Sequence, residues 1–501
     1  MISFLISLVA LVLGYMIYGT FVDRVFGPDP KRPTPAISKA DGVDYIAMPS
    51  WKVYMIQFLN IAGTGPIFGA IMGAKFGPSS YLWIVLGCIF AGAVHDYMCG
   101  MLSVRHGGVG FPELVGQYLG QRTKKVMLVF SIILLLLVGT VFVYSPALIL
   151  GDIAGDGSRG SIMLWVVIIF LYYIIATLLP IDKLIGKVYP LFAVALLFMA
   201  AALMVCLLMK WPSLPEFWDG LGGWSEKAGL KGQPIFPCLF ITIACGAISG
   251  FHATQSPLMA RCIQNEKMGR PVFYGSMITE GVVALIWAAV SSWFFFDGGA
   301  AAVGADTSAA APAVVTKVSQ NWLGILGGIL AILGVVAAPI TSGDTAFRSA
   351  RLIIADFLHM EQKQIGKRLV VAIPLFVGSA LLLWYNIADA NGFNTIWRYF
   401  GWSNQSLAAF MLWTATVYLV KRNPGRPGAA RPYYLITLLP ALFMTAVCVA
   451  FILIDKTGFR LPQTLAPWIG IGTFVVSTVL FYWWKFTHAP NSCKTEVPHT
   501  E

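Results

Sequence analysis

Ionisable side chains in apolar surroundings are the features of this sequence that are best able to do chemistry. His95 and Asp96 stand side by side, Glu280 and Asp344 each interrupt a long apolar stretch, and His252 lies in a stretch rich in glycine. If such stretches cross a bilayer, each ionisable group costs at least about 2.5 kcal/mol to insert, so it is a functional candidate. Because histidine titrates near neutral pH, His252 is the best candidate for proton coupling or substrate contact.

Each of these residues also has a purely structural interpretation. Asp96 can pair with Arg105, and Asp344 can pair with an arginine one helical turn further on. His95 can face the inner interface, and Glu280 can lie close enough to the cytoplasmic end of its helix to reach water. The sequence leaves both interpretations open.

Two apolar stretches contain residues that disrupt a continuous helix. One reads Asn-Ile-Ala-Gly-Thr-Gly-Pro over residues 60–66, and the other reads Cys-Gly-Ala-Ile-Ser-Gly-Phe-His over residues 245–252. Unpaired backbone groups in lipid cost several kcal/mol each, so a broken helix survives only inside protein or beside a cavity. We therefore predict two broken helices. The alternative is tight packing of unbroken helices at small residues.

The rest of the chain indicates which elements position these residues. Of the 501 residues, 57% are hydrophobic and 11% are charged, and the mean hydropathy is +0.75. Soluble domains carry roughly a quarter charged residues, so the composition excludes an ordinary soluble fold, a disordered chain and a basic nucleic-acid binder. The predicted fold class is an all-α polytopic membrane protein. Thirteen stretches of about 20 apolar residues are candidate spans: Ile2–Val22, Val53–Ala74, Phe76–Met101, Val126–Leu150, Ser161–Ile181, Val188–Met209, Ile235–Leu258, Val272–Phe296, Trp322–Thr345, Leu369–Ala388, Tyr399–Val420, Tyr433–Ile454 and Ala466–Trp484.

Basic residues set the predicted orientation. With an external N-terminus, 25 of the 34 Lys and Arg residues fall in segments assigned to the cytoplasm and 9 in external segments. Because basic residues gather in cytoplasmic loops, this contrast predicts an external N-terminus and a cytoplasmic C-terminus. Among the longer connections, residues 297–320 form either a short helix across the outer mouth or a flexible loop.

The two glycine-rich stretches fall in the second and seventh candidate spans. Because they are five spans apart, they enter the membrane from opposite sides, and such paired interruptions are the best sequence pointer to an inverted-repeat transporter. We predict repeats at residues 51–210 and 234–422. The predicted flanking parts are a helix and cytoplasmic loop at 1–50, two helices at 432–486 and a cytoplasmic tail at 487–501.

The stretches 60–66 and 245–252 belong to a wider set of motifs, which also covers residues 91–96, 103–108, 344–351 and 400–405. From about residue 50 to 410, these motifs together resemble the carbon starvation protein A family of inner-membrane transporters. His95 stands where the family pattern has glutamine, and the chain is shorter than the longest members.

The resemblance implies import of a small carboxylate-bearing nutrient through the inner (cytoplasmic) membrane. Members are associated with peptide uptake during carbon starvation, and relatives with pyruvate uptake. The resemblance also implies a leucine-transporter-like fold, in which a sodium site lies between the first broken helix and the eighth core helix. Ala338, Thr341 and Ser342 resemble the ligand pattern of that site. The implied coupling ion is sodium or a proton, with no organic cofactor.

We therefore hypothesise secondary active import, with the substrate bound at mid-membrane between the two broken helices. The N–H groups of a half-helix take its carboxylate, because a helix N-terminus carries partial positive charge. The substrate-contact candidates are Asn60, Gly63, Thr64, Gly65, Ser249 and His252. The coupling or proton candidates are His95, Asp96, Glu280 and Asp344.

A membrane sensor that binds the same nutrient without moving it is the alternative from another class. No cytoplasmic segment is long enough for a signalling domain, which disfavours the sensor. No HExxH, GxSxG or Walker A motif occurs in the sequence, so we predict that the protein is not an enzyme. The predicted partners are the small-molecule substrate and the lipid bilayer, with no nucleic acid. The oligomeric state stays open.

Overall fold

The computed structural model describes residues 1–153, 155–178, 185–230, 232–360, 364–389, 392–422 and 432–488. These residues form helices and connecting turns, with no β-strand among them. The α-helices are α1 (Ile2–Leu13), α2 (Thr20–Phe26), α3 (Pro35–Ser38), α4 (Ser50–Ile61), α5 (Ala70–Ala74), α6 (Ser79–Gly87), α7 (Ala93–Arg105), α8 (Phe111–Leu119), α9 (Gln121–Ile153), α10 (Arg159–Leu178), α11 (Ile185–Lys210), α12 (Trp224–Lys227), α13 (Phe240–Thr242), α14 (Phe251–Ala260), α15 (Ser276–Phe296), α16 (Gly299–Ala302), α17 (Ala311–Phe357), α18 (Ile365–Ala388), α19 (Gly392–Arg422), α20 (Leu435–Ile454) and α21 (Ala466–His488). Short π-helical or 3-10 turns are η1 (Gly14–Gly19), η2 (Gly65–Gly69), η3 (Cys88–Gly92), η4 (Phe217–Asp219), η5 (Ile235–Leu239), η6 (Glu266–Met268), η7 (Arg270–Gly275) and η8 (Gln463–Leu465).

The predicted all-α membrane fold is confirmed, whereas the count of thirteen spans is not. Within the described residues, nine helices are long and apolar enough to cross a membrane, or ten if the bent pair Ser50–Ile61 and Gly65–Ala74 forms one span. The three other predicted spans lie on the α13–α14 region, α17 and α19, which are helical but fall outside that set.

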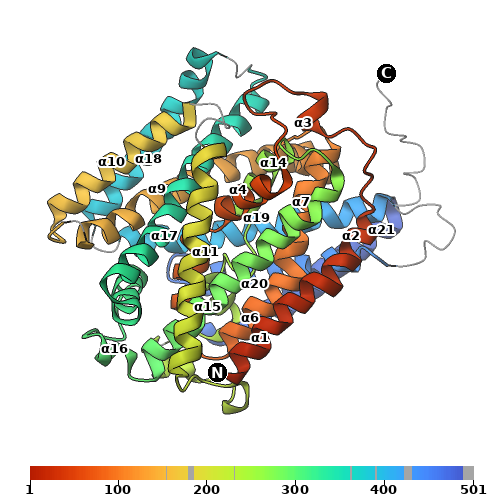
Figure 1. Ribbon diagram of the computed structural model, residues 1–501. Coiled ribbons are helices and arrows are strands. Elements are labelled where there is room, and N and C mark those ends of the chain that lie inside the picture. The colour runs from red at the N-terminus through yellow and green to blue at the C-terminus, as the bar shows by residue number, and fades with distance from the viewer. Residues whose placement is uncertain are drawn as a thin grey trace.

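Figure 1 shows the helices packed side by side, with α10 and α18 on one flank and α1, α2 and α6 on the opposite flank. Between them, α17 packs against α9 and α11, while α14 packs against α4 and α7. The broken elements therefore lie in the interior of the bundle, where unpaired backbone groups can find protein partners.

Segments that the sequence assigns to one side of the membrane meet at one end of the bundle. At the predicted cytoplasmic end, Glu266 pairs with Arg105 and accepts a hydrogen bond from the N–H of Asp29. At the other end, Glu216 accepts a hydrogen bond from the N–H of Ile2 at 2.9 Å. These contacts agree with the prediction that successive connections lie on alternate sides of the membrane. Which end faces the cytoplasm stays a prediction, as do the repeat boundaries.

The predicted external segment 297–320 is partly helical. It contains α16 and the first turns of α17, which changes direction at Gly324, where φ is 66° and ψ is −171°. This left-handed backbone conformation favours glycine. The helical alternative therefore holds for part of this segment. Of the predicted tail 487–501, residues 489–501 lie outside the described residues.

Candidate functional site

The first predicted break occurs between α4 and α5. The helix ends at Ile61, and the axes on the two sides of the break differ by 54°. Pro66 has no N–H, so it cannot continue the hydrogen-bond ladder of α4. A Cβ atom at Gly65 would lie 2.3 Å from both Cβ and Sγ of Cys245. Glycine at this position therefore allows the first break to lie directly against the second.

The second break covers residues 243–250, between α13 and α14. Gly246 adopts a φ of 89°, which favours glycine. Asn404 of α19 binds the freed groups: its Oδ1 accepts hydrogen bonds from the Phe251 N–H at 2.6 Å and from the Ser249 hydroxyl at 3.1 Å. Both predicted breaks are thus confirmed, and the second is held by a side chain from a distant helix.

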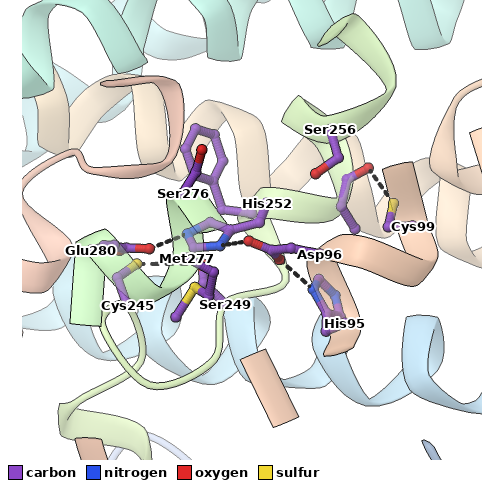
Figure 2. A network of polar contacts seen from close by, with 12 residues as sticks. His95, Asp96, Cys99, Cys245, Ser249, His252, Ser256, Ser276, Met277 and Glu280 are labelled. Atoms are coloured by element: carbon purple, nitrogen blue, oxygen red, sulfur yellow. Dashed lines mark hydrogen bonds and ion pairs between the residues drawn. The ribbon is translucent and has the colours of Figure 1, made fainter. Parts of the chain in front are cut away.

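Four ionisable residues meet beside the second break (Figure 2). His252 Nδ1 lies 2.8 Å from Asp96 Oδ2, and His95 Nδ1 lies 2.7 Å from Asp96 Oδ1. On its other side, His252 Nε2 lies 3.5 Å from Glu280 Oε2. All four side chains have no exposed surface. We call Glu280, His252, Asp96 and His95 the buried network; it joins α15, α14 and α7.

The chemistry of the donors assigns roles within the buried network. An ionised carboxylate only accepts hydrogen bonds, so each oxygen of Asp96 accepts one hydrogen bond when both histidines donate through Nδ1–H. Glu280 Oε1 accepts the N–H of Gly246 at 3.1 Å. Among the described residues, His252 Nε2 and Glu280 Oε2 have no hydrogen-bond partner and face each other, and His95 Nε2 also has no partner. The facing pair is therefore a candidate position for the gain or loss of a proton.

The structural alternatives for Asp96 and Glu280 are wrong. Asp96 pairs with the two histidines, whereas Arg105 pairs with Glu266 and donates to Tyr418. Glu280 has no exposed surface and so does not reach water at the helix end. The residue next to Asp96 in sequence, His95, is buried with it rather than placed at an interface.

A metal ion is a second possible ligand of this region. The ligand atoms of Cys245, His252 and Glu280 lie within 4.8 Å of one another. The Cys245 thiol donates to Ser249 at 3.3 Å, whereas His252 Nε2 and Glu280 Oε2 have no hydrogen-bond partner among the described residues. The three side chains therefore fit a metal ion as well as a hydrogen-bonded cluster.

The predicted substrate-contact residues lie around the two breaks in different settings. Asn60 and Thr64 are fully buried, and neither side chain has a hydrogen-bond partner in the part of the chain that the structure describes. Ser249 contacts Cys245 and Asn404. Gly63 lies against a ring, since a Cβ there would be 2.5 Å from Cζ of Phe142. The unpaired Asn60 and Thr64 are the groups best suited to bind a polar ligand, because burying them without partners is costly.

Asp344 lies apart from the buried network. Its Oδ2 accepts a hydrogen bond from Tyr172 of α10 at 3.1 Å. The arginine one turn further on, Arg348, donates to the Ala176 carbonyl at 2.9 Å and lies 3.6 Å from Asp44. The structure thus separates Asp344 from the other three coupling candidates.

The residues of the predicted sodium site lie beside the first break. The Ser342 hydroxyl donates to the Leu59 carbonyl at 2.9 Å, across from α17 to α4. The Thr341 hydroxyl donates to the Ala338 carbonyl at 2.9 Å within its own helix. These oxygens form the kind of all-oxygen donor set that suits a hard cation, so the residues fit the predicted ion.

A cavity of about 500 Å³ opens at the predicted external end. It is lined by residues of η2, α13 and α19 and by the turn after α20. A smaller space beside Gly65 and Cys245 shares Thr242 and Trp397 with it. The cavity therefore approaches the point where the two breaks meet.

Sequence reasoning did not select Asn404 or Cys245 as site residues, although both lie in motifs that it singled out. Asn404 comes from α19, more than 150 positions beyond the break that it binds. A polar residue in an apolar helix is a general signal, but only the fold reveals the partner.

Comparison with known protein families identifies the family of this chain. The family model for carbon starvation protein CstA matches residues 1–154, 151–323 and 318–450. The chain belongs to the CstA family. An uncharacterised membrane protein of Haemophilus influenzae is 48% identical over 59% of this chain and 91% of its own length. The peptide transporter CstA of Campylobacter jejuni is 28% identical over 86% of this chain and 77% of its own.

A further relative and a solved structure are also similar to this chain. The pyruvate/proton symporter BtsT of Escherichia coli is 27% identical over 55% of this chain and 46% of its own length. Among solved structures, the manganese transporter of Eremococcus coleocola matches with a TM-score of 0.55 at 13% identity, over 90% of this chain and 99% of its own. The structural match shows a shared transporter fold and nothing about the cargo.

Proposed function

We propose that the chain is a proton-coupled secondary importer of small carboxylate-bearing nutrients, with peptides as the first substrate class. The observation that carries this proposal is the facing pair His252 Nε2 and Glu280 Oε2, buried beside a helix break with no other partner among the described residues. Buried ionisable groups in membrane proteins mark proton relays and substrate paths. The family membership and the transporter names of the relatives support the transport class.

The proposed coupling step moves one proton. When Glu280 is ionised and His252 is protonated, the two side chains attract each other, and Asp96 holds the imidazole in place through Nδ1. Adding a proton to Glu280 removes that attraction. Because the N–H of Gly246 donates to the same carboxyl group, protonation also weakens a bond that fixes the second break. The proton thereby biases the geometry of the substrate pocket.

The proposed substrate pocket lies where the breaks meet. The substrate carboxylate binds at the start of η2, where Gly65 carries an N–H and the partial positive charge of a helix N-terminus favours an anion. Asn60 and Thr64 supply buried polar groups that have no hydrogen-bond partner among the described residues. We also propose that residues 51–210 and 234–422 act as inverted repeats around this pocket.

Sodium is the second candidate for the coupling ion. The contact between Ser342 and the Leu59 carbonyl brings the predicted sodium ligands to the first break. A pyruvate/proton symporter is the alternative substrate assignment, supported by the name of one relative. Peptides take precedence because relatives named as peptide transporters cover 86% of this chain, against 55% for the pyruvate relative.

Uptake by purified protein in proteoliposomes tests the proposal. We expect accumulation of a labelled dipeptide when a proton gradient is imposed, and none when only a sodium gradient is imposed at clamped pH. Labelled pyruvate serves as the competing substrate. Failure to accumulate either compound under either gradient contradicts secondary transport.

Two variants then separate coupling from binding. Glu280→Gln removes the titratable carboxyl group at nearly constant shape, so proton-driven accumulation is lost while exchange of labelled for unlabelled substrate continues. Asp344→Asn is the matched control, because Asp344 is an equally buried carboxylate outside the buried network. Equal loss of accumulation in both variants contradicts the assigned role of Glu280.

A further inference from the structure

The cavity at the predicted external end carries charges of both signs on its wall. Arg398 Nη1 donates to Asp455 Oδ2 at 2.9 Å, and Asp455 Oδ1 also accepts the Thr457 hydroxyl at 2.6 Å. Asp455 is therefore a carboxylate held firmly in place. The neighbouring Lys456 is exposed, and its ammonium makes no hydrogen bond or ion pair within the described part of the chain.

Another part of the cavity wall is aromatic. Phe68, Phe393 and Trp397 all line the cavity. The ring centroid of Trp397 lies 6.2 Å from that of Phe68 and 5.9 Å from that of Phe393. These three rings form a continuous apolar surface that leads toward the smaller space beside Gly65, which Trp397 also lines.

We propose that this cavity is a second binding site, which holds a zwitterionic peptide before it enters the central pocket. The peptide carboxylate binds Lys456, its amino group approaches Asp455, and an apolar side chain packs on the three rings. A volume of about 500 Å³ falls within the range of small-ligand sites. A three-carbon monocarboxylate has neither an ammonium group for Asp455 nor a side chain for the rings.

This inference rests on the proposed function, because it names the substrate class of the same pathway. Binding is therefore measured without transport, on protein in detergent, with labelled Ala-Phe as the probe. Unlabelled Ala-Phe amide, N-acetyl-Ala-Phe and pyruvate are the competitors. All measurements are repeated in a Glu280→Gln background, which lacks the carboxyl group of the proposed coupling step.

The expected result is a specific link between Lys456 and the peptide carboxylate. Lys456→Gln weakens binding of Ala-Phe about two- to fivefold, the size expected for a solvent-exposed ion pair. The same substitution leaves binding of Ala-Phe amide unchanged, and Lys456→Arg restores the affinity for Ala-Phe. Lys317→Gln is the control, because Lys317 bonds the Gly304 carbonyl and does not line the cavity.

Three outcomes overturn the inference. Lys456→Gln weakens the amide as much as the acid, the acetylated peptide competes as well as Ala-Phe, or pyruvate competes as well as Ala-Phe. Pyruvate binding alone removes this site as a peptide site and leaves proton-coupled import standing. A Lys456 effect together with normal accumulation by Glu280→Gln supports this site and contradicts the proposed coupling.

Discussion

The substitution Gly65→Ala tests whether the two breaks share one pocket. The new Cβ would lie 2.3 Å from Cβ and Sγ of Cys245, whereas ordinary contacts begin near 3.4 Å, so the two segments must separate by about 1 Å. Overpacking of this kind costs about 1–3 kcal/mol. That cost is below the usual stability of a folded protein, so we expect a folded variant with a displaced pocket.

Two measurements on each variant give the answer: the thermal midpoint in detergent and the initial rate of uptake in proteoliposomes. For Gly65→Ala we expect a modestly lower thermal midpoint and at least a tenfold lower uptake rate. A factor of ten in rate corresponds to about 1.4 kcal/mol, which lies within the expected cost of overpacking. Adding Cys245→Gly removes both contacting atoms and restores part of the rate. Gly366→Ala in α18 is the control, because a Cβ there meets no described residue within 4 Å.

The proposed contact between the two breaks is refuted if Gly65→Ala has the same uptake rate and thermal midpoint as Gly366→Ala. It is also refuted if Gly65→Ala loses activity and Cys245→Gly gives no recovery at a normal thermal midpoint. The first result means that the breaks are not in contact, and the second means that their contact does not govern transport.

Three further predictions concern stability. Asn404→Ala removes the acceptor of the Phe251 N–H bond and lowers the free energy of unfolding by about 1–3 kcal/mol, and Asn404→Asp recovers much of this loss in chemical denaturation. Glu266→Ala leaves the partly buried Arg105 without its carboxylate partner and costs about 1–3 kcal/mol, measured as a lower thermal midpoint that Glu266→Asp partly restores. Burial raises the pKa of Glu216, but hydrogen bonds from the first residues of α1 outweigh burial and hold the pKa below its ordinary value of 4.5. Because the pKa is lower in the folded state than in the unfolded state, Glu216 stabilises the fold above about pH 4.5, and this stabilisation is lost as the pH falls. We therefore expect Glu216→Gln to flatten the curve of thermal midpoint against pH in that range.

The helix breaks could be predicted from sequence because their causes are local. Gly63, Gly65 and Pro66 disrupt a helix wherever it packs, and the glycines at 246 and 250 do the same in the second break. The number of spans could not be settled in this way. Three predicted spans lie on helices outside the set that is long and apolar enough by itself.

The partners of the ionisable residues could not be predicted, because they depend on packing between helices. Arg105 is about two and a half helical turns from Asp96 in sequence, yet His95 and His252 bond that carboxylate instead. Asp344 carries the same sequence signal as Glu280, although its partner is Tyr172 on another helix. Sequence therefore identified the candidates, and the fold decided which of them form one network.

Proton movement during substrate entry tests the central claim most directly. Proteoliposomes containing a pH-sensitive dye receive labelled substrate outside, with no imposed ion gradient. Proton coupling through Glu280 predicts internal acidification that accompanies substrate entry in the wild type, and exchange without acidification in Glu280→Gln. Substrate entry without acidification in the wild type, or equal acidification in Glu280→Gln, contradicts it.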